Sequence, residues 1–264
     1  MRPLLSATAI HLQRNLLHRA FWLQLLIGRI LPIAIPLLAW EALFDYTQAV
    51  ELQGWSRHEM TTYYIIVFFI SLFAEINFHY EMSSMVYQGT LSQWLMRPLS
   101  FFETAASFIL AKILLLFIPG FIVLMIGVWL APPFPSTSPF LSLLSGIAVF
   151  PLAIAIFGLL SAIIGMLSFW VMRTESIFAL IMLTLEFFGG RLLPLSLLPG
   201  WLQSLSSLLP LRFAISLPTE AVISPGQFPL APIFIGQIIW CVILSCIAYF
   251  LWKKGLQQYD AVGG

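Results

Sequence analysis

The chain has 264 residues, of which 60% are hydrophobic and only 9% are charged, and its mean hydropathy is +0.97. This composition lies far outside the range of soluble globular proteins and predicts an integral membrane protein. The formal net charge of +1 and the lack of an arginine- or lysine-rich arm argue against a nucleic-acid-binding protein.

Residues 1–20 precede the first long apolar run and predict an amphipathic helix on the inner membrane surface. Its apolar residues recur at three- to four-residue spacing: Leu5, Ala9, Leu12 and Leu16. Its polar face carries His11, Arg14, His18 and Arg19. A plain basic anchor in front of the first span is the alternative interpretation.

Six apolar runs follow, each long enough to be a membrane span of about 20 residues. They cover residues 21–44, 61–80, 104–130, 140–172, 176–193 and 228–252. The predicted fold class is therefore an all-α membrane protein with a single transmembrane domain over residues 1–264. Prolines inside the first and fourth runs predict kinks at Pro32, Pro36 and Pro151.

The basic residues near the span ends predict that both termini lie in the cytoplasm, because cytoplasmic loops carry an excess of Lys and Arg. One side collects Arg2, Arg14, Arg19, Arg97, Lys112, Arg173, Lys253 and Lys254. The other side has Arg57, Arg191 and Arg212.

Ionisable residues inside spans are costly unless they are paired or hydrated. Arg29 in the first span and Glu75 in the second lie at matching depths, which predicts a charge pair joining these spans. Glu186 and Arg191, near the outer end of the fifth span, form a second candidate pair, although either could reach water instead.

The stretch QGTLSQWLMRPLS, residues 88–100, predicts a short helix on the cytoplasmic face between the second and third spans. Thr90 and Gln93 fit a capping box, and Pro98 prevents continuation of the helix. The apolar stripe consists of Leu91, Trp94 and Leu95, and Arg97 lies at the negative end of the helix dipole. The residues leave open whether this segment is functional or only connects two spans.

The fourth span carries small residues near four-residue spacing: Gly158, Ser161, Ala162 and Gly165. They allow close helix packing, either inside one subunit or at a dimer seam.

Residues 191–226 contain five prolines, at positions 194, 199, 210, 218 and 225, which cut an apolar sequence into pieces too short to span. A re-entrant helical hairpin over about residues 194–226, on the outer side, fits both this pattern and the charge rule. Its candidate gating residues are Gly189, Gly190, Pro194, Pro199, Trp201 and Pro210. An outer cap that only packs is the alternative.

No catalytic signature is found, so the chain is not expected to be an enzyme. A P-loop needs glycine directly before lysine, and no lysine here follows a glycine. HExxH and GxSxG are absent, and the four histidines lack partners at metal spacing, which favours solvated or interfacial histidines and no metal site. Cys241 and Cys246 lie too far apart along one helix for a disulfide.

The order of these features resembles the permease subunit of type-2 ABC exporters, in the six-span subgroup often linked to drug or antibiotic export. Three motifs carry the resemblance: QGTLSQWLMRPLS, FFGGRLLPLSLLPGWLQSLSSLLPLRFAISLP and KKGLQQYDAVGG. The match covers nearly the whole chain. MSSMVY before Gly89 is a departure, because relatives often have an arginine-containing sequence there.

The resemblance implies a multi-pass permease of the bacterial inner membrane, paired with a second, identical or homologous permease and with two cytoplasmic ATPase subunits that bind ATP and Mg. The helix after the second span would then be the ATPase-coupling element. Its residues are Gly89, Thr90, Leu91, Trp94, Leu95, Arg97 and Pro98. An amphiphilic or lipid-like substrate, moved out of the cytoplasm, is expected.

Two other functions remain as alternatives. A secondary transporter or channel without an ATPase partner would need inverted repeats, midplane broken helices or a charged ring. Here the only broken region is predicted on the outer side. A membrane-embedded enzyme lacks a nucleophile or metal set.

Overall fold

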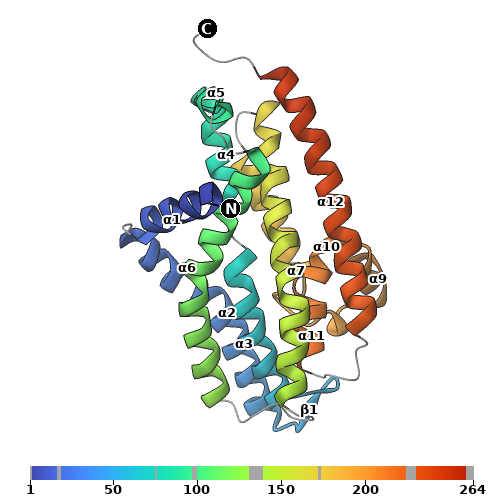
Figure 1. Ribbon diagram of the computed structural model, residues 1–264. Coiled ribbons are helices and arrows are strands. Elements are labelled where there is room, and N and C mark those ends of the chain that lie inside the picture. Colours follow the sequence, from blue (N-terminus) through green and yellow to red (C-terminus); the bar gives the residue numbers. More distant parts are fainter. Residues whose placement is uncertain are drawn as a thin grey trace.

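Long helices run side by side through most of the molecule (Figure 1). The computed structural model describes residues 2–16, 19–74, 76–96, 100–130, 139–171, 174–223 and 230–259. The helices of the first half are α1 (Arg2–Leu16), α2 (Arg19–Thr47), α3 (Arg57–Ala74), α4 (Phe78–Tyr87), α5 (Leu91–Leu95) and α6 (Phe101–Leu130). Those of the second half are α7 (Pro139–Met166), α8 (Glu175–Phe188), α9 (Gly200–Ser207), α10 (Pro210–Ala214), α11 (Ser216–Ile223) and α12 (Leu230–Gln258). The 3-10 turns are η1 (Leu167–Phe169) and η2 (Leu195–Leu197).

Four helical stretches of the described chain are long and apolar enough to cross a membrane: Arg57–Tyr87, Phe101–Ile122, Leu144–Phe169 and Leu230–Gln258. They fall on the second, third, fourth and sixth predicted spans, and α2 covers the first. The protein is thus an integral, multi-pass, all-α membrane protein. Six complete crossings stay a prediction.

The fifth predicted span is shorter than expected. α8 has 14 residues, a length of about 21 Å, whereas a hydrocarbon core is about 30 Å thick. It ends at Phe188, so the predicted helical end at residue 193 is wrong. Gly189 caps the helix and Gly190 has a positive φ of 81°, which ends the helical path.

α3 lies at the centre of the bundle, packed against α2, α6, α7 and α11. Nearly all of its residues from Met60 to Ala74 are buried, which explains why this sequence is apolar on every face rather than amphipathic. The predicted span 61–80 lies within the candidate span Arg57–Tyr87. The helical path is broken inside it, because Asn77 adopts a left-handed backbone (φ 55°) and α4 begins after it.

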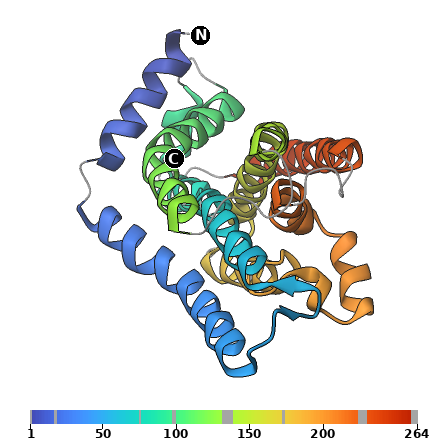
Figure 2. The ribbon, with the colours of Figure 1, turned by 90° about the horizontal axis from the view of Figure 1, so that it is seen from below.

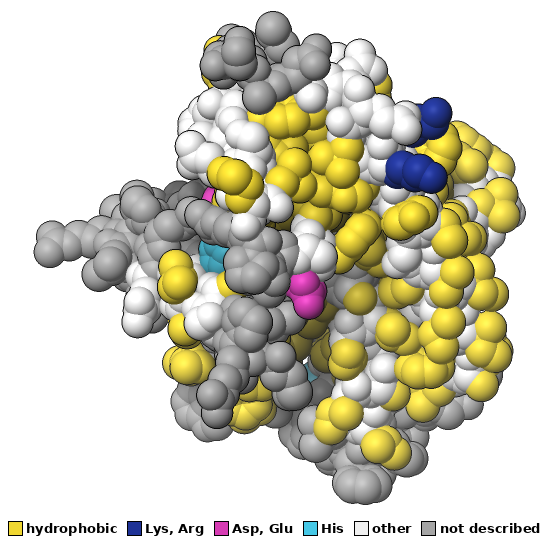
Figure 3. Space-filling view, turned by 45° about the horizontal axis from the view of Figure 1, so that its top comes forward, with side chains coloured by type: hydrophobic (Ala, Val, Ile, Leu, Met, Phe, Trp, Pro, Cys, Tyr) yellow, Lys and Arg dark blue, Asp and Glu magenta, His cyan; other side chains and the backbone are white. Residues whose placement is uncertain are grey.

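α12, by contrast, packs mainly on α7 and leaves most of its apolar side chains exposed in the single chain. Hydrophobic side chains cover most of the described surface on this side of the molecule (Figure 3). The exposed apolar side chains of α12 include Ile235, Ile239 and Val242. Such a face requires lipid or another subunit as its environment.

α1 crosses the bundle at an angle and packs against α6 (Figures 1 and 2). His11, predicted to be solvated or interfacial, is not solvated, because its ring lies edge-on to Phe108 of α6 with centroids 5.5 Å apart. Ile10 is exposed. α1 therefore turns Thr8 and His11 toward α6, and the side chains of Leu5 and Leu16 from the predicted apolar stripe lie outside the described residues.

The small residues of the fourth predicted span face other helices of the same chain. A Cβ atom at Gly158 would lie 2.8 Å from Ile109 Cδ1 of α6, and one at Gly165 would lie 2.8 Å from Met82 Cβ of α4. The alternative of packing inside one subunit is the one that the structure shows for these two positions.

The two ends of the bundle carry different elements. α5 and the carboxyl end of α12 lie at one end, and a small β-hairpin lies at the other (Figure 1). The hairpin joins β1 (Glu51–Leu52) to β2 (Trp55–Ser56) through Gln53 and Gly54, both with positive φ, as a two-residue turn requires. With the predicted orientation, the α5 end is cytoplasmic and the hairpin end is outer.

Candidate functional sites at the two ends of the bundle

The first candidate site is the tip formed by α4, α5 and the turn between them. Gly89 has a φ of +69°, a conformation that favours glycine, and it reverses the chain after α4. The predicted capping box is wrong, because Thr90 has a helical backbone and makes no side-chain cap bond. Ser92 Oγ instead donates to the Gly89 carbonyl at 3.2 Å.

Burial along α5 differs from the predicted apolar stripe. Leu91 is only 1% exposed and belongs to the core of the chain, and Trp94 is half-buried against that core. Leu95 and Met96 are 49% and 80% exposed. The apolar surface available to a partner is therefore formed by Leu95 and Met96 rather than by Leu91. Arg97 and Pro98 lie outside the described residues.

α4 is fixed to the bundle by buried polar and aromatic contacts. The His79 ring stacks on Phe178 of α8, with centroids 3.8 Å apart, and its backbone N–H donates to Ser161 Oγ of α7 at 3.2 Å. Ser83 and Thr174 share a hydrogen bond between their hydroxyls. The prediction of a solvated or interfacial His79 is wrong, since this residue is fully buried. α4 is thus held to both α7 and α8 by direct contacts.

The second candidate site begins at the outer end of α8. The side chains of Tyr63 and Tyr64, on α3, donate hydrogen bonds to the carbonyls of Gly190 and Leu192. A Cβ atom at Gly190 would lie 2.8 Å from the Tyr63 hydroxyl and 3.0 Å from Ser216 Cβ. The chain therefore turns here in a space that only glycine fits.

Glu186 and Arg191 form an ion pair across this turn, with Nη1 and Oε1 2.8 Å apart. Arg191 is buried, and the Leu192 N–H donates to the Glu186 carbonyl at 2.9 Å. The pair holds the end of α8 against the turn. The other predicted pair stays a prediction, because Glu75 and the side chain of Arg29 lie outside the described part of the chain.

Three prolines of the broken region lie at the starts of helices rather than interrupting one. Pro194 and Pro199 precede η2 and α9, and Pro210 is the first residue of α10, where its missing N–H costs nothing. Trp201 is exposed on α9. α10 reaches α12 at Gly236, about 9 Å along that helix from its first residue. The broken region thus extends inward from the outer end.

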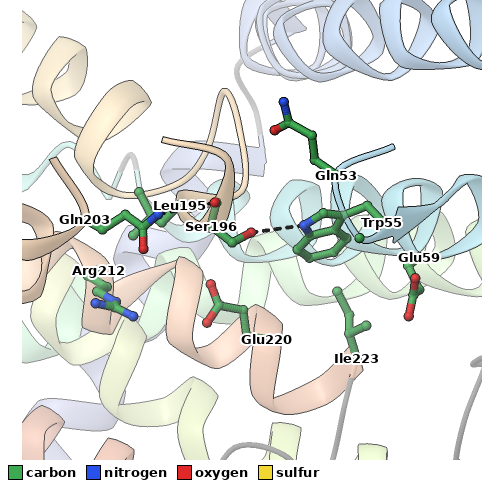
Figure 4. A pocket seen from close by; sticks show the side chains of 10 residues that line it. Gln53, Trp55, Glu59, Leu195, Ser196, Gln203, Arg212, Glu220 and Ile223 are labelled. Carbon is green, nitrogen blue, oxygen red and sulfur yellow. Dashed lines mark hydrogen bonds between the residues drawn. The ribbon is translucent and has the colours of Figure 1, made fainter. Parts of the chain in front are cut away.

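A pocket of about 370 Å³ lies between the hairpin, α3 and the broken region (Figure 4). It is lined by Gln53, Gly54, Trp55, Glu59, Leu195, Ser196, Gln203, Arg212, Glu220 and Ile223. Burial raises the pKa of the Glu220 carboxyl, and the hydrogen bond from Ser216 and the charge of Arg212 oppose this change. Sequence reasoning missed this pocket because its walls come from separate segments. The acidic Glu220 in the apolar stretch LPTEAVI was the available signal.

Comparison with known protein families gives one match. The family described as ABC-2 family transporter protein matches residues 30–263, nearly the whole chain. The chain belongs to the ABC-2 transporter family. The resemblance to a type-2 ABC permease is therefore confirmed. No curated protein and no solved structure matches it.

The two candidate sites lie at opposite ends of the bundle. The α4–α5 tip lies at the end of the bundle where α12 ends, and the polar pocket lies beside the hairpin at the other end (Figures 1 and 4). α3 joins the two ends, since it continues into α4 on one side and holds the Gly190 turn on the other.

Proposed function

We propose that the chain is the membrane-spanning permease subunit of an ATP-driven exporter. In this proposal two separate cytoplasmic ATPase subunits bind ATP and Mg, and a second permease, identical or homologous, completes the transport path. Membership of the ABC-2 transporter family supports the assignment of an ABC permease.

The α4–α5 tip is the observation that carries the ATPase partnership. It exposes Leu95 and Met96 at the end of a short helix, while Leu91 anchors that helix in the core. An apolar knob on a rigid support is suited to a groove on another protein. In this proposal Arg97, which follows Met96 in the sequence, contacts the rim of that groove.

Movement of the tip would be transmitted through α4. Because His79 and Ser83 are bonded to α7 and α8, closure of the ATPases beneath the tip would displace these helices as packed units. The far end of α8 is the Gly190 turn, where the Tyr63 hydrogen bond and the Glu186–Arg191 pair hold the broken region. This turn is therefore where we place the outer gate.

The exposed apolar face of α12 is available to lipid or to a second permease. With 23 Phe and 9 Met and few charges, a path between two such chains suits an amphiphilic or lipid-like molecule. Export from the cytoplasm, and the bacterial inner membrane as its location, follow from the family resemblance.

Photo-crosslinking from the tip tests the proposal. We expect a crosslinker at position 96 to capture a protein that hydrolyses ATP and contains a P-loop peptide by mass spectrometry. The variants Leu95→Glu and Met96→Glu should lower recovery of that ATPase about tenfold, because a charge buried in an apolar interface costs more than about 1.4 kcal/mol. Gln257→Glu, an exposed change at the same end of the bundle, is the matched control.

A different result would favour the alternative. If the purified chain carries no ATPase and still moves substrate in vesicles that lack ATP, the protein is a secondary transporter or channel. Equal ATPase recovery from Met96→Glu and the Gln257→Glu control would show that the tip is not the docking element.

A further inference from the structure

The outer pocket is a built polar site that the coupling mechanism does not use. Its charged walls come from three helices, with Glu59 on α3, Arg212 on α10 and Glu220 on α11. The hairpin adds Trp55, whose indole N–H donates to Ser196 Oγ at 3.0 Å and whose ring lies edge-on to Tyr63. The indole is therefore held in one position. The volume of about 370 Å³ suits one small polar group.

Two oppositely charged side chains of this pocket have hydrogen-bonding capacity that no described residue fills. Glu220 is only 8% exposed and points into the pocket, and one of its oxygens accepts the Ser216 hydroxyl. The buried Nε of Arg212 has no hydrogen-bond partner among the described residues. Within that part of the chain the two side chains also form no ion pair with each other.

Glu220 is buried and Arg212 is half-buried, and the charge of Arg212 acts on Glu220 without an ion pair between the two side chains. A ligand group that lies between them can pair with both charges and offset the cost of their burial. A ligand with only a negative charge would be repelled by Glu220, and a ligand with only a positive charge would be repelled by Arg212. A zwitterion satisfies both walls at once. Its anionic end would lie at the guanidinium, which suits phosphate, and its ammonium end would lie at Glu220, beside an indole wall.

The surroundings of the pocket suggest how such a group would be presented. Trp201, Leu205 and Leu208 are exposed at four- and three-residue spacing on and just after α9. Gln203, from the same helix, lines the pocket. Gln203 and the stripe lie on opposite faces of α9, because residues two positions apart point in nearly opposite directions on a helix. The acyl chains of a bound lipid would therefore pass over α9 from the pocket to reach the stripe.

We propose that this pocket binds a zwitterionic phosphoethanolamine-type group, with its phosphate at Arg212 and its primary ammonium at Glu220. The inference goes beyond the exporter function and does not depend on the ATPase partnership. The same chemistry occurs in a membrane lipid and in a free solute, and the experiment separates these two sources.

Binding to the purified full-length chain tests the proposal without any ATPase. We expect glycerophosphoethanolamine to bind at least about tenfold more tightly than glycerophosphate or ethanolamine, because each half-ligand loses one charge-assisted contact. Glu220→Gln should remove the preference over glycerophosphate, and Arg212→Gln the preference over ethanolamine. Arg212→Lys should retain part of the preference over ethanolamine. Glu51→Gln, on the hairpin outside the pocket, is the control.

Native mass spectrometry of chains released from nanodiscs identifies the source. The ligand is a lipid if the wild-type chain retains phosphatidylethanolamine over phosphatidylglycerol and the Glu220→Gln variant does not. The ligand is a free solute if the soluble headgroup binds but neither lipid is retained. Equal affinity for the whole and half headgroups, or unchanged selectivity in both variants, overturns the proposal. If a variant does not fold, the ligand series on the wild-type chain still decides.

Discussion

At the scale of single residues, the Gly190 turn shows how narrowly the outer site is specified. Three constraints meet there, namely a positive φ, the Tyr63 hydroxyl and the neighbouring Ser216. Each of them excludes a side chain, so the turn depends on glycine for both its conformation and its space.

We expect Gly190→Ala to destabilise the chain by about 2–3 kcal/mol, because it combines a strained backbone with a steric clash. Thermal unfolding of the purified protein should show a fall in Tm of several degrees, roughly 5 °C or more. Gly200→Ala is the matched control, because no atom lies within 4 Å of a Cβ added there. Similar shifts for both variants would contradict a special role for the turn.

Residues close in sequence were the predictable part of the candidate sites. Glu186 and Arg191 are five positions apart at one helix end, and the structure brings them together. The prediction that Leu91 offers an apolar surface to a partner is wrong, because this side chain lies in the core. Spacing shows that Leu91 shares a helix face with Trp94 and Leu95, but it does not show which part of that face is buried. Trp55, Glu59 and Glu220 converge only in three dimensions, so no local pattern indicates their pocket.

At the scale of helices, hydropathy located the spans well but not their breaks or ends. The predicted run 104–130 agrees with α6 (Phe101–Leu130), yet α12 continues six residues past the predicted end at 252. A helix no longer needs apolar residues once it leaves the hydrocarbon, so Lys253 and Lys254 do not end it. After the break at Asn77, α4 packs against α7 and η1, and a sequence window contains no information on such tertiary contacts.

α4 and α7 pack closely at Gly165, which allows a test of this contact. A Cβ atom at Gly165 would lie 3.0 Å from the His79 Cα, a backbone atom that cannot move without shifting α4. We expect Gly165→Ala to cost about 1–3 kcal/mol in stability, and to lower transport per ATP hydrolysed in proteoliposomes if α4 transmits the movement. Insertion into the membrane should remain normal.

Gly158→Ala provides the comparison for this variant. The atom it would meet is Ile109 Cδ1, the far end of a flexible side chain that can turn aside. Its cost should stay below about 1 kcal/mol. A larger loss of stability or coupling in Gly158→Ala than in Gly165→Ala would show that α4 is not the rigid connection described here.

At the scale of the whole molecule, the two ends of the bundle must face opposite sides of the membrane for the proposed mechanism to work. The α5 tip and the carboxyl end of α12 share one end, and the β-hairpin and its pocket share the other. The bias of Lys and Arg assigns the α5 end to the cytoplasm. This assignment is the premise shared by the ATPase contact and the outer gate.

Single-cysteine labelling tests the orientation in spheroplasts. Cys241 and Cys246, both free thiols, are first replaced by alanine. We expect a membrane-impermeant maleimide to label Glu51→Cys in intact spheroplasts, and to label Gln257→Cys only after permeabilisation. Ile239→Cys, on the exposed apolar face of α12, should react only after detergent solubilisation, because a thiol in lipid does not form the reactive thiolate. Labelling of Gln257→Cys from outside would place the α5 tip beyond the reach of a cytoplasmic ATPase, and the coupling role of Leu95 and Met96 would have to be abandoned.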